Sequence, residues 1–155
     1  MMGFSLLFIR IKNSDIADAD RLGINQFLTQ QGLQILPQGN SCGLVDHNGD
    51  SLTFNGDFTD LHVDPLDQSE PVTGGINHTT LSKEECQFIY ALCVAGGLMI
   101  INPQGTPMYL VPHRNHAPED VPNLDDAAWV NNADELRAAL SEVFDAFKIF
   151  KRKIL

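Results

Sequence analysis

The sequence predicts an α+β fold, in which a mixed or mostly antiparallel sheet with β-hairpins is covered by three helices. Segments rich in branched and aromatic residues are typical of strands, two Asn-Gly pairs predict tight hairpins, and three segments with helical spacing carry capping residues. The chain has 155 residues, of which 43% are apolar. A chain of this length can form a core without metals or disulfides, so we predict a single α+β domain over residues 1–155.

The chain begins with the pattern strand, helix, strand. The segment GFSLLFIRIK, residues 3–12, is predicted to be a buried strand. Asp18 or Asp20 can open a helix that ends at Gly32 and turns three apolar side chains inward, those of Leu22, Phe27 and Leu28. Residues 33–37 then form a short strand.

Two Asn-Gly pairs follow, Asn48-Gly49 and Asn55-Gly56. Each predicts a type I′ hairpin, because both residues of that turn need a positive φ and these two residue types tolerate it. Together they predict a three-stranded meander over residues 43–63. The polar segment 64–75 is predicted to be a loop.

The second half adds a helix, a hairpin and a final helix. Ser82 and Glu85 form a capping box, in which each side chain satisfies a free backbone N–H, and this helix ends at Gly96-Gly97. Residues 98–102 and 108–111 predict a hairpin, and residues 112–128 a long loop. The last helix begins near Asn132 with apolar positions Leu136, Leu140, Val143, Phe144, Phe147 and Phe150, and carries a basic cluster, Lys148, Lys151, Arg152 and Lys153, in its last turns.

The net charge of the chain limits the classes of molecule that it is expected to bind. The chain has 20 Asp and Glu against 10 Lys and Arg, a formal charge of −10. We expect no nucleic-acid partner, because that affinity comes mainly from Lys and Arg, and basic proteins are the natural partners instead. We expect no membrane span and a cytoplasmic location, because the apolar start of the chain runs at once into Arg10 and Lys12. Cys42, Cys86 and Cys93 are expected to be buried thiols.

The strongest candidate for a binding site is an acidic segment without Lys or Arg between Arg21 and Lys83. Such a segment should create a field of one sign that steers and orients a cationic partner. The alternative is that its acids are turn formers on a solvated face. The predicted partner-binding residues are Asp46, Asp50, Asp57, Asp60, Asp64, Asp67 and Glu70.

Two stretches of the acidic segment have metal-like spacing. Asp46, Asn48 and Asp50, with Asp57 in twelfth place, imitate a calcium loop, but Ser51 stands where Gly is required. Asp60, His62 and Asp64 alternate along one strand and could form a mixed nitrogen and oxygen ligand set. Polar residues on a solvent-facing strand explain the second pattern more simply, so we expect no metal and no cofactor.

A further cluster with ligand-type side chains lies in the predicted loop 112–128. His113 and His116, followed by Glu119 and Asp120, could hold zinc or act in catalysis, although the flanking prolines favour an irregular loop. Cys86, early in a helix, is a weak nucleophile candidate because Glu84 and Glu85 oppose its ionisation.

The segment LSKEECQFIYALCVAGGLMIINPQG, residues 81–105, and the N-terminal GFSLLFIRIK resemble segments of small bacterial immunity proteins encoded beside secreted type VI or polymorphic toxin effectors. The resemblance implies a cytosolic protein that binds a cognate toxin and blocks its active site or its conformational change. It transfers no residue role, because such families are diverse in sequence. For a nuclease toxin, the acidic face would mimic phosphate.

Three functions stay open. The first is a non-enzymatic inhibitor that binds a basic toxin through its acidic surface. The second is a small metal-dependent enzyme using His113 and His116, or Asp60, His62 and Asp64. The third is a regulatory protein-binding module. An enzyme should bring His and carboxylate side chains within about 3 Å of one another or of a metal, whereas an inhibitor should spread its carboxylates over an exposed face.

Overall fold

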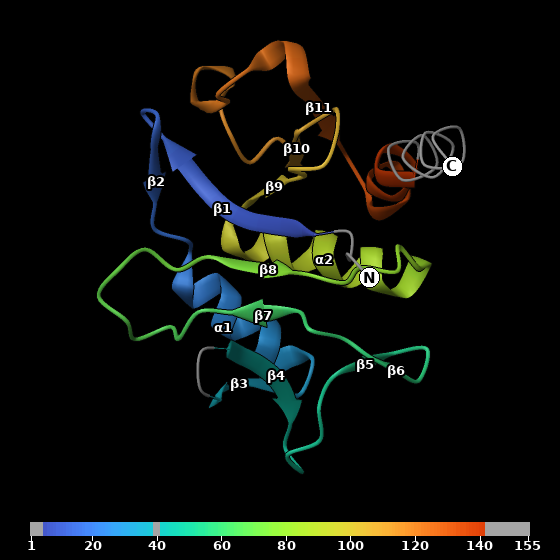
Figure 1. The fold of residues 1–155 in the computed structure, drawn as a ribbon. Helices are drawn as coiled ribbons and strands as arrows, with labels where there is room; N and C mark the ends of the chain where they lie inside the picture. Colours follow the sequence, from blue (N-terminus) through green and yellow to red (C-terminus); the bar gives the residue numbers. More distant parts are fainter. Residues whose placement is uncertain (1–4, 39–40, 142–155) are drawn as a thin grey trace.

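The computed structural model describes residues 5–38 and 41–141, and a large mixed sheet forms the centre of this part of the chain (Figure 1). Its strand order is β11-β10-β9-β1-β8-β7-β4-β3, with β2 paired to β1, and every pair is antiparallel except β10 with β11. The strands are β1 (Leu6–Lys12), β2 (Asp15–Ala17), β3 (Leu33–Gln38), β4 (Ser41–Asp46), β7 (His62–Val63), β8 (Gly74–Ile76), β9 (Met99–Ile101), β10 (Tyr109–Pro112) and β11 (Ala127–Val130). The predicted α+β class is confirmed.

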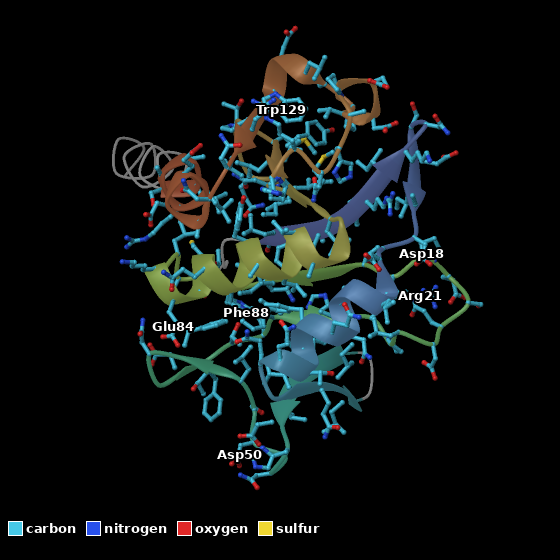
Figure 2. The ribbon with its side chains drawn as sticks, turned by 180° about the vertical axis from the view of Figure 1, so that it is seen from behind. Asp18, Arg21, Asp50, Glu84, Phe88 and Trp129 are labelled. Carbon is cyan, nitrogen blue, oxygen red and sulfur yellow. The ribbon has the colours of Figure 1, made fainter. Side chains whose placement is uncertain are left out.

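Helices α1 (Arg21–Gln30) and α2 (Lys83–Gly96) lie together on one face of the sheet (Figures 1 and 2). A third helix is described over residues 133–141, and its Leu136 and Leu140 are fully buried in the same core. The core is therefore closed between one sheet face and three helices, as predicted. The apolar positions Val143, Phe144, Phe147 and Phe150 and the basic cluster lie outside the described residues.

Helix α1 begins where its capping residue predicts, because the Asp20 carboxylate accepts a hydrogen bond from the Gly23 amide over 2.9 Å. Its buried face differs from the prediction. Ile24 and Leu28, one turn apart, are buried, while Leu22 is 65% exposed. A helix that begins at Arg21 turns position 22 away from the sheet once positions 24 and 28 face it, so the inward orientation predicted for Leu22 was wrong.

Helix α2 begins with the predicted cap, since Ser82 Oγ accepts from the Glu85 amide over 3.1 Å. The reciprocal half of the capping box is shifted. The Glu85 carboxylate accepts from the amides of Thr80 and Leu81 instead of from Ser82. Burial raises the pKa of Glu85, and these hydrogen bonds only partly oppose that effect.

The predicted meander over residues 43–63 is divided between two sheets. Strand β4 pairs with β3 and β7, while β5 (Thr53–Phe54) and β6 (Asp57–Phe58) form a separate two-stranded hairpin. Asn55 and Gly56 have φ of 52° and 84°, which confirms the predicted hairpin turn. At the other pair only Gly49 has a positive φ, and a single bridge from Val45 to Ser51 closes that loop.

Two strands lie within predicted loops. Strand β8 occupies the end of segment 64–75, and β11 the end of segment 112–128, after short 3-10 helices η1 (Pro118–Asp120) and η2 (Leu124–Asp126). Glycine suits β8 because its neighbours are close: a Cβ at Gly74 would lie 2.8 Å from the His62 carbonyl oxygen. The segment before β11 covers a second apolar cluster formed by Ile11, Met99, Ile101, Val111 and Val121.

In residues 5–38 and 41–141, no helix combines the length and the apolar character that a membrane crossing requires.

Candidate protein-binding surface

The seven predicted partner-binding acids are divided among three projections of the half of the fold that contains β3, β4 and β7 (Figure 1). Asp46 is the last residue of β4, and Asp50 lies on the turn that follows it, at the lower tip of the molecule in Figure 2. Asp57 lies on the β5–β6 hairpin and Asp60 on the segment that leaves it, while Asp64, Asp67 and Glu70 lie on the loop between β7 and β8. The hairpin and that loop leave opposite ends of β7. The acids therefore surround this half of the molecule instead of forming one cluster.

Three of the seven carboxylates hold the local backbone. Asp46 Oδ1 accepts from the amides of Asn48 and Asp50, over 2.8 and 3.0 Å. Asp64 Oδ2 accepts from the amide and the hydroxyl of Thr73, over 2.9 and 3.0 Å. These contacts are the turn-forming role that the alternative interpretation gave to the acids.

Asp60 is the third of these carboxylates. It accepts from the backbone amides of Asn77 and His78 and lies 2.5 Å from Nδ1 of the His78 ring. Partial burial raises the pKa of Asp60, but the hydrogen bonds from His78 and Asn77 outweigh that effect and hold the pKa below its ordinary 3.8. Asp60 is therefore an ionised anchor that joins the end of β8 to the segment before β7.

The other four acids, Asp50, Asp57, Asp67 and Glu70, form the acidic rim. All four are exposed, and their carboxylates accept no hydrogen bond within the described part of the chain. The nearest arginine does not neutralise them. Arg21 pairs with Asp18 at 2.9 Å and donates its remaining N–H groups to backbone carbonyls of the β7–β8 loop, including Leu66 and Gln68. The rim carboxylates are thus available to an external cation.

The β5–β6 hairpin adds an apolar contact that the acidic pattern did not predict. Phe58 is 83% exposed, directly after Asp57. Phe54 pairs with Asp57 and Phe58 pairs with Thr53, so the two phenylalanines lie on opposite faces of the hairpin. A two-residue Asn-Gly turn fixes which residues of a hairpin pair, and this pairing places Phe54 and Phe58 on opposite faces. The sequence could therefore have identified one of the two phenylalanines as exposed.

One face and the turn of this hairpin are fixed to the helices. Phe54 is buried and its ring centroid lies 5.5 Å from that of Phe88 on α2, which in turn contacts Phe27 of α1 edge to face at 5.3 Å. The Asn55 amide donates to Glu84 Oε2 over 2.8 Å. Phe58 is therefore exposed on an element whose opposite face is packed against the core.

In the predicted loop 112–128, the His116 side chain has a structural role. Its Nε2 lies 3.2 Å from the Ile11 amide, and its Nδ1 lies 2.6 Å from Asn115 Oδ1. Both contacts are satisfied by the neutral ring with its proton on Nδ1. Burial lowers the pKa of His116, and the positive charge of Arg10 lowers it further.

His113 is exposed and begins a turn, with φ of 53°, and it does not line the cavity that His116 borders. A cavity of about 700 Å³ beside this loop contains no carboxylate in its lining, which consists of Arg114, Asn115, His116, Ala117, Pro118 and Trp129. His and carboxylate side chains therefore do not converge here in the way that the enzyme hypothesis expected.

The metal-like spacings do not become ligand sets. Nowhere in residues 5–38 and 41–141 do three His, Cys, Asp or Glu side chains converge closely enough to hold an ion. The Asp60 carboxylate, before β7, accepts from the Asn77 amide, and the Asp64 carboxylate, after β7, accepts from the Thr73 amide. The His62 ring packs near Gly75. Asp46 is engaged by turn amides, and Asp57 lies on a different projection. The metal-dependent alternative thus finds no ligand group in this part of the chain.

Cys86 and Cys93 are buried thiols, as expected. Burial raises the pKa of Cys86 to about 12, with a further contribution from the charge of Glu85, and burial also raises the pKa of Cys93. A thiol with such a pKa stays protonated near neutral pH, which argues against Cys86 as a nucleophile. The side chain of Cys42 lies outside the described residues.

Comparisons with protein-family models, curated proteins and solved structures find no match to this chain. Function is therefore inferred from the geometry and from the resemblance of residues 81–105 described above. Among the large apolar side chains of the described residues, Phe58 is the most exposed, and it lies on the same hairpin as Asp57 of the acidic rim.

Proposed function

We propose that this chain is a non-enzymatic immunity protein that binds and neutralises a cognate, basic, cytosol-acting toxin effector. The observation that carries the protein-binding part of the proposal is Phe58, which is 83% exposed on a hairpin anchored to α2. The choice of a toxin as the partner rests on the resemblance of residues 81–105 to immunity proteins. Aromatic residues, phenylalanine among them, are enriched at protein interfaces relative to the rest of the protein surface. A rigid base reduces the entropy that such a contact loses on binding.

The acidic rim supplies the second half of the proposed interface. Asp57 lies on the same hairpin as Phe58 but on its other face, and Asp50 lies on the turn that precedes this hairpin in the chain. None of the four rim carboxylates is paired within the described residues. Negative potential of this kind raises the rate at which a positively charged partner arrives and orients it during the encounter. A basic protein is therefore the partner that this surface fits.

The two features should control different rate constants. Long-range attraction by the rim governs association and weakens as salt screens it, with a screening length of about 8 Å at physiological ionic strength. Burial of Phe58 in the partner governs dissociation, because apolar contacts form only after docking. For a nuclease partner, the rim carboxylates would occupy positions that substrate phosphates take.

The test begins by capturing the partner from the native host with the full chain and identifying it. The purified pair is then studied by surface plasmon resonance at low and high salt. We expect Phe58→Ala to raise the dissociation rate at least tenfold with little change in association. We expect Asp50→Asn with Asp57→Asn to slow association about tenfold at low salt. Lys83→Gln, at an exposed residue outside the rim, is the matched control.

Neutralisation is tested separately, by expressing the captured partner alone and together with this chain. We expect the partner alone to stop growth, wild-type chain to restore it, and Phe58→Ala to restore it less well. A partner that is harmless when expressed alone would contradict the immunity role and favour a regulatory module. Identical rate constants for wild type and Phe58→Ala would remove the hairpin from the interface.

A further inference from the structure

Strand β3 is the last strand on its side of the sheet. It pairs with β4 over six residues, from Leu33 with Asp46 to Gln38 with Ser41. Its other edge pairs with no strand in the part of the chain that the structure describes. An edge of this kind can pair with an added strand wherever its backbone N–H and C=O groups point outward.

The hydrogen bonds of β4 show which groups of β3 point outward. The Leu44 carbonyl accepts from the Leu52 amide, and the Asp46 amide donates to the Asp50 carbonyl, each over 2.9 Å. Leu44 and Asp46 thus direct their backbone groups away from β3. In an antiparallel ladder their register partners, Ile35 and Leu33, direct their own groups away from β4 as well. Both residues therefore present an N–H and a C=O to the free edge.

Pro37 limits this edge. It is in register with Cys42, two residues beyond Ile35, so it has the same outward orientation but has no N–H to offer. Proline is a device by which natural sheets prevent uncontrolled pairing at their edges. The part of β3 that can accept a further strand is thus confined to the three residues from Leu33 to Ile35.

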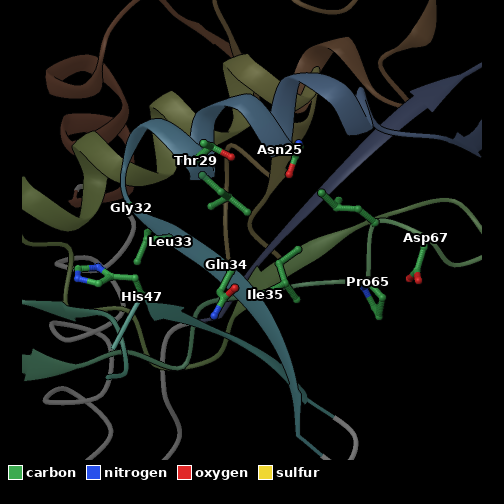
Figure 3. A pocket seen from close by; sticks show the side chains of 11 residues that line it. Asn25, Thr29, Gly32, Leu33, Gln34, Ile35, His47, Pro65 and Asp67 are labelled. Carbon is green, nitrogen blue, oxygen red and sulfur yellow. The ribbon is translucent and has the colours of Figure 1, made fainter. Parts of the chain in front are cut away.

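A cavity borders these same three residues (Figure 3). It measures about 730 Å³ and lies between α1, β3 and the start of the β7–β8 loop. In Figure 3, Asn25 and Thr29 of α1 form one wall, and Pro65 and Asp67 lie on the far side. Its lining includes apolar side chains from Leu28, Leu33, Ile35 and Leu66, the ring of His47, and one carboxylate, Asp67, but no Lys or Arg.

We propose that this edge and cavity form a second binding site, which accepts a short extended segment of a partner protein by β-strand addition. The segment pairs its backbone with Leu33 and Ile35, places one apolar side chain in the cavity, and turns a Lys or Arg toward Asp67. Backbone pairing supplies affinity in this mode of recognition, while pockets for alternate side chains supply specificity. The site lies apart from Phe58 and the hairpin, and Asp67 is the one residue that it shares with the acidic rim.

The charge of the cavity lining and the length of the free edge indicate which segment binds here. A cavity whose lining includes a carboxylate but no Lys or Arg favours a basic segment over an acidic one. An edge closed by Pro37 favours a few residues of extended chain over a long strand. A second copy of this chain fits less well, because each copy carries a formal charge of −10.

The test uses a capped pentapeptide of alternating lysine and isoleucine, titrated into isotopically labelled full-length protein. Two control probes are the same peptide with glutamate in place of lysine, and the lysine peptide N-methylated at alternate residues so that it cannot form a ladder. Amide chemical shifts and hydrogen exchange are recorded for Leu33, Gln34 and Ile35. We expect shifts centred on these residues and exchange of the Leu33 and Ile35 amides slowed at least tenfold, for the lysine peptide only.

Two variants complete the test. Ile35→Pro removes one outward N–H without touching the bonds to β4, and Thr29→Trp fills the cavity from an exposed position of α1. We expect both to abolish peptide binding and Phe58→Ala to leave it unchanged. The absence of shifts at millimolar peptide, equal binding of the N-methylated probe, or undiminished binding by a folded Thr29→Trp variant would each overturn the proposal. Dimerisation of the free protein that Ile35→Pro abolishes would assign the edge to a second copy instead.

Discussion

The backbone amide of Asn55, at the tip of the β5–β6 hairpin, donates a hydrogen bond to the Glu84 carboxylate, in the first turn of α2, over 2.8 Å. The contact joins segments 29 residues apart and holds the hairpin turn against the helix. Because the hairpin pairs with no other described strand, this bond and the packing of Phe54 together determine where Phe58 is presented.

Glu84→Ala should loosen the hairpin without unfolding the domain. The variant removes the acceptor for the Asn55 amide, so hydrogen exchange at that amide should accelerate at least tenfold. The free energy of unfolding should change by less than about 0.5 to 1 kcal/mol, as is usual for exposed positions. Gln87→Ala, an exposed neighbour on α2, is the control and should leave Asn55 exchange unchanged. Equal exchange in both variants would show that the bond does not hold the turn.

The two phenylalanines of the hairpin should separate stability from binding. Phe54 is 6% exposed and Phe58 is 83% exposed. Phe54→Ala should lower the free energy of unfolding by about 3 kcal/mol, because it empties a packed position against Phe88. Phe58→Ala should change it by less than about 0.5 kcal/mol. Urea titrations followed by circular dichroism measure both, and a large loss for Phe58→Ala would mean that this side chain packs in the fold.

His116 should make the protein less stable in mild acid. Burial, aided by the charge of Arg10, lowers the pKa of His116 below its ordinary 6.5, so the unfolded chain takes up this proton more readily. The stability that neutral His116 contributes to the folded state is fully present above about pH 6.5. It falls as the pH drops toward the pKa of His116 in the folded protein, and below that pKa it no longer changes. His116→Gln should therefore show a smaller fall in unfolding free energy between about pH 8 and about pH 5 than wild type. Urea titrations at both values decide, and equal falls would contradict the assignment.

The buried thiols should resist alkylation in the native protein. Burial and the charge of Glu85 raise the pKa of Cys86 to about 12, and Cys93 is also buried with a raised pKa. Iodoacetamide at neutral pH should leave both residues unmodified in the native protein and modify both in urea, as mapped by peptide mass spectrometry. Rapid native modification of Cys86 would instead reopen its role as a nucleophile.

Local chemistry made most of the fold predictable. Asp20 and Ser82 cap α1 and α2, Gly97 ends α2 with φ of 64°, and Asn55-Gly56 forms the predicted turn. Such features depend on residues near one another in the chain, and the sequence displays them directly. Strand β8 is different, because Gly74 and Gly75 have little intrinsic preference for strands and are selected by the close approach of their neighbours.

The candidate surface was predictable only in part, for a related reason. The absence of Lys and Arg from residues 22–82 is visible in the sequence, and so is the number of acids. Which carboxylates are engaged depends on contacts between distant segments, such as Asp60 with Asn77 and His78. The exposure of Phe58 likewise depends on Phe54 finding Phe88 on a helix that follows much later.

The position of β1 in the middle of the sheet also bears on how the protein is made. Leu7 pairs with Gly75 on one side and with Ile101 on the other. A ribosome must therefore synthesise the chain as far as Ile101 before β1 has both neighbours, and until then β1 keeps a row of unpaired backbone N–H and C=O groups that can pair with other chains.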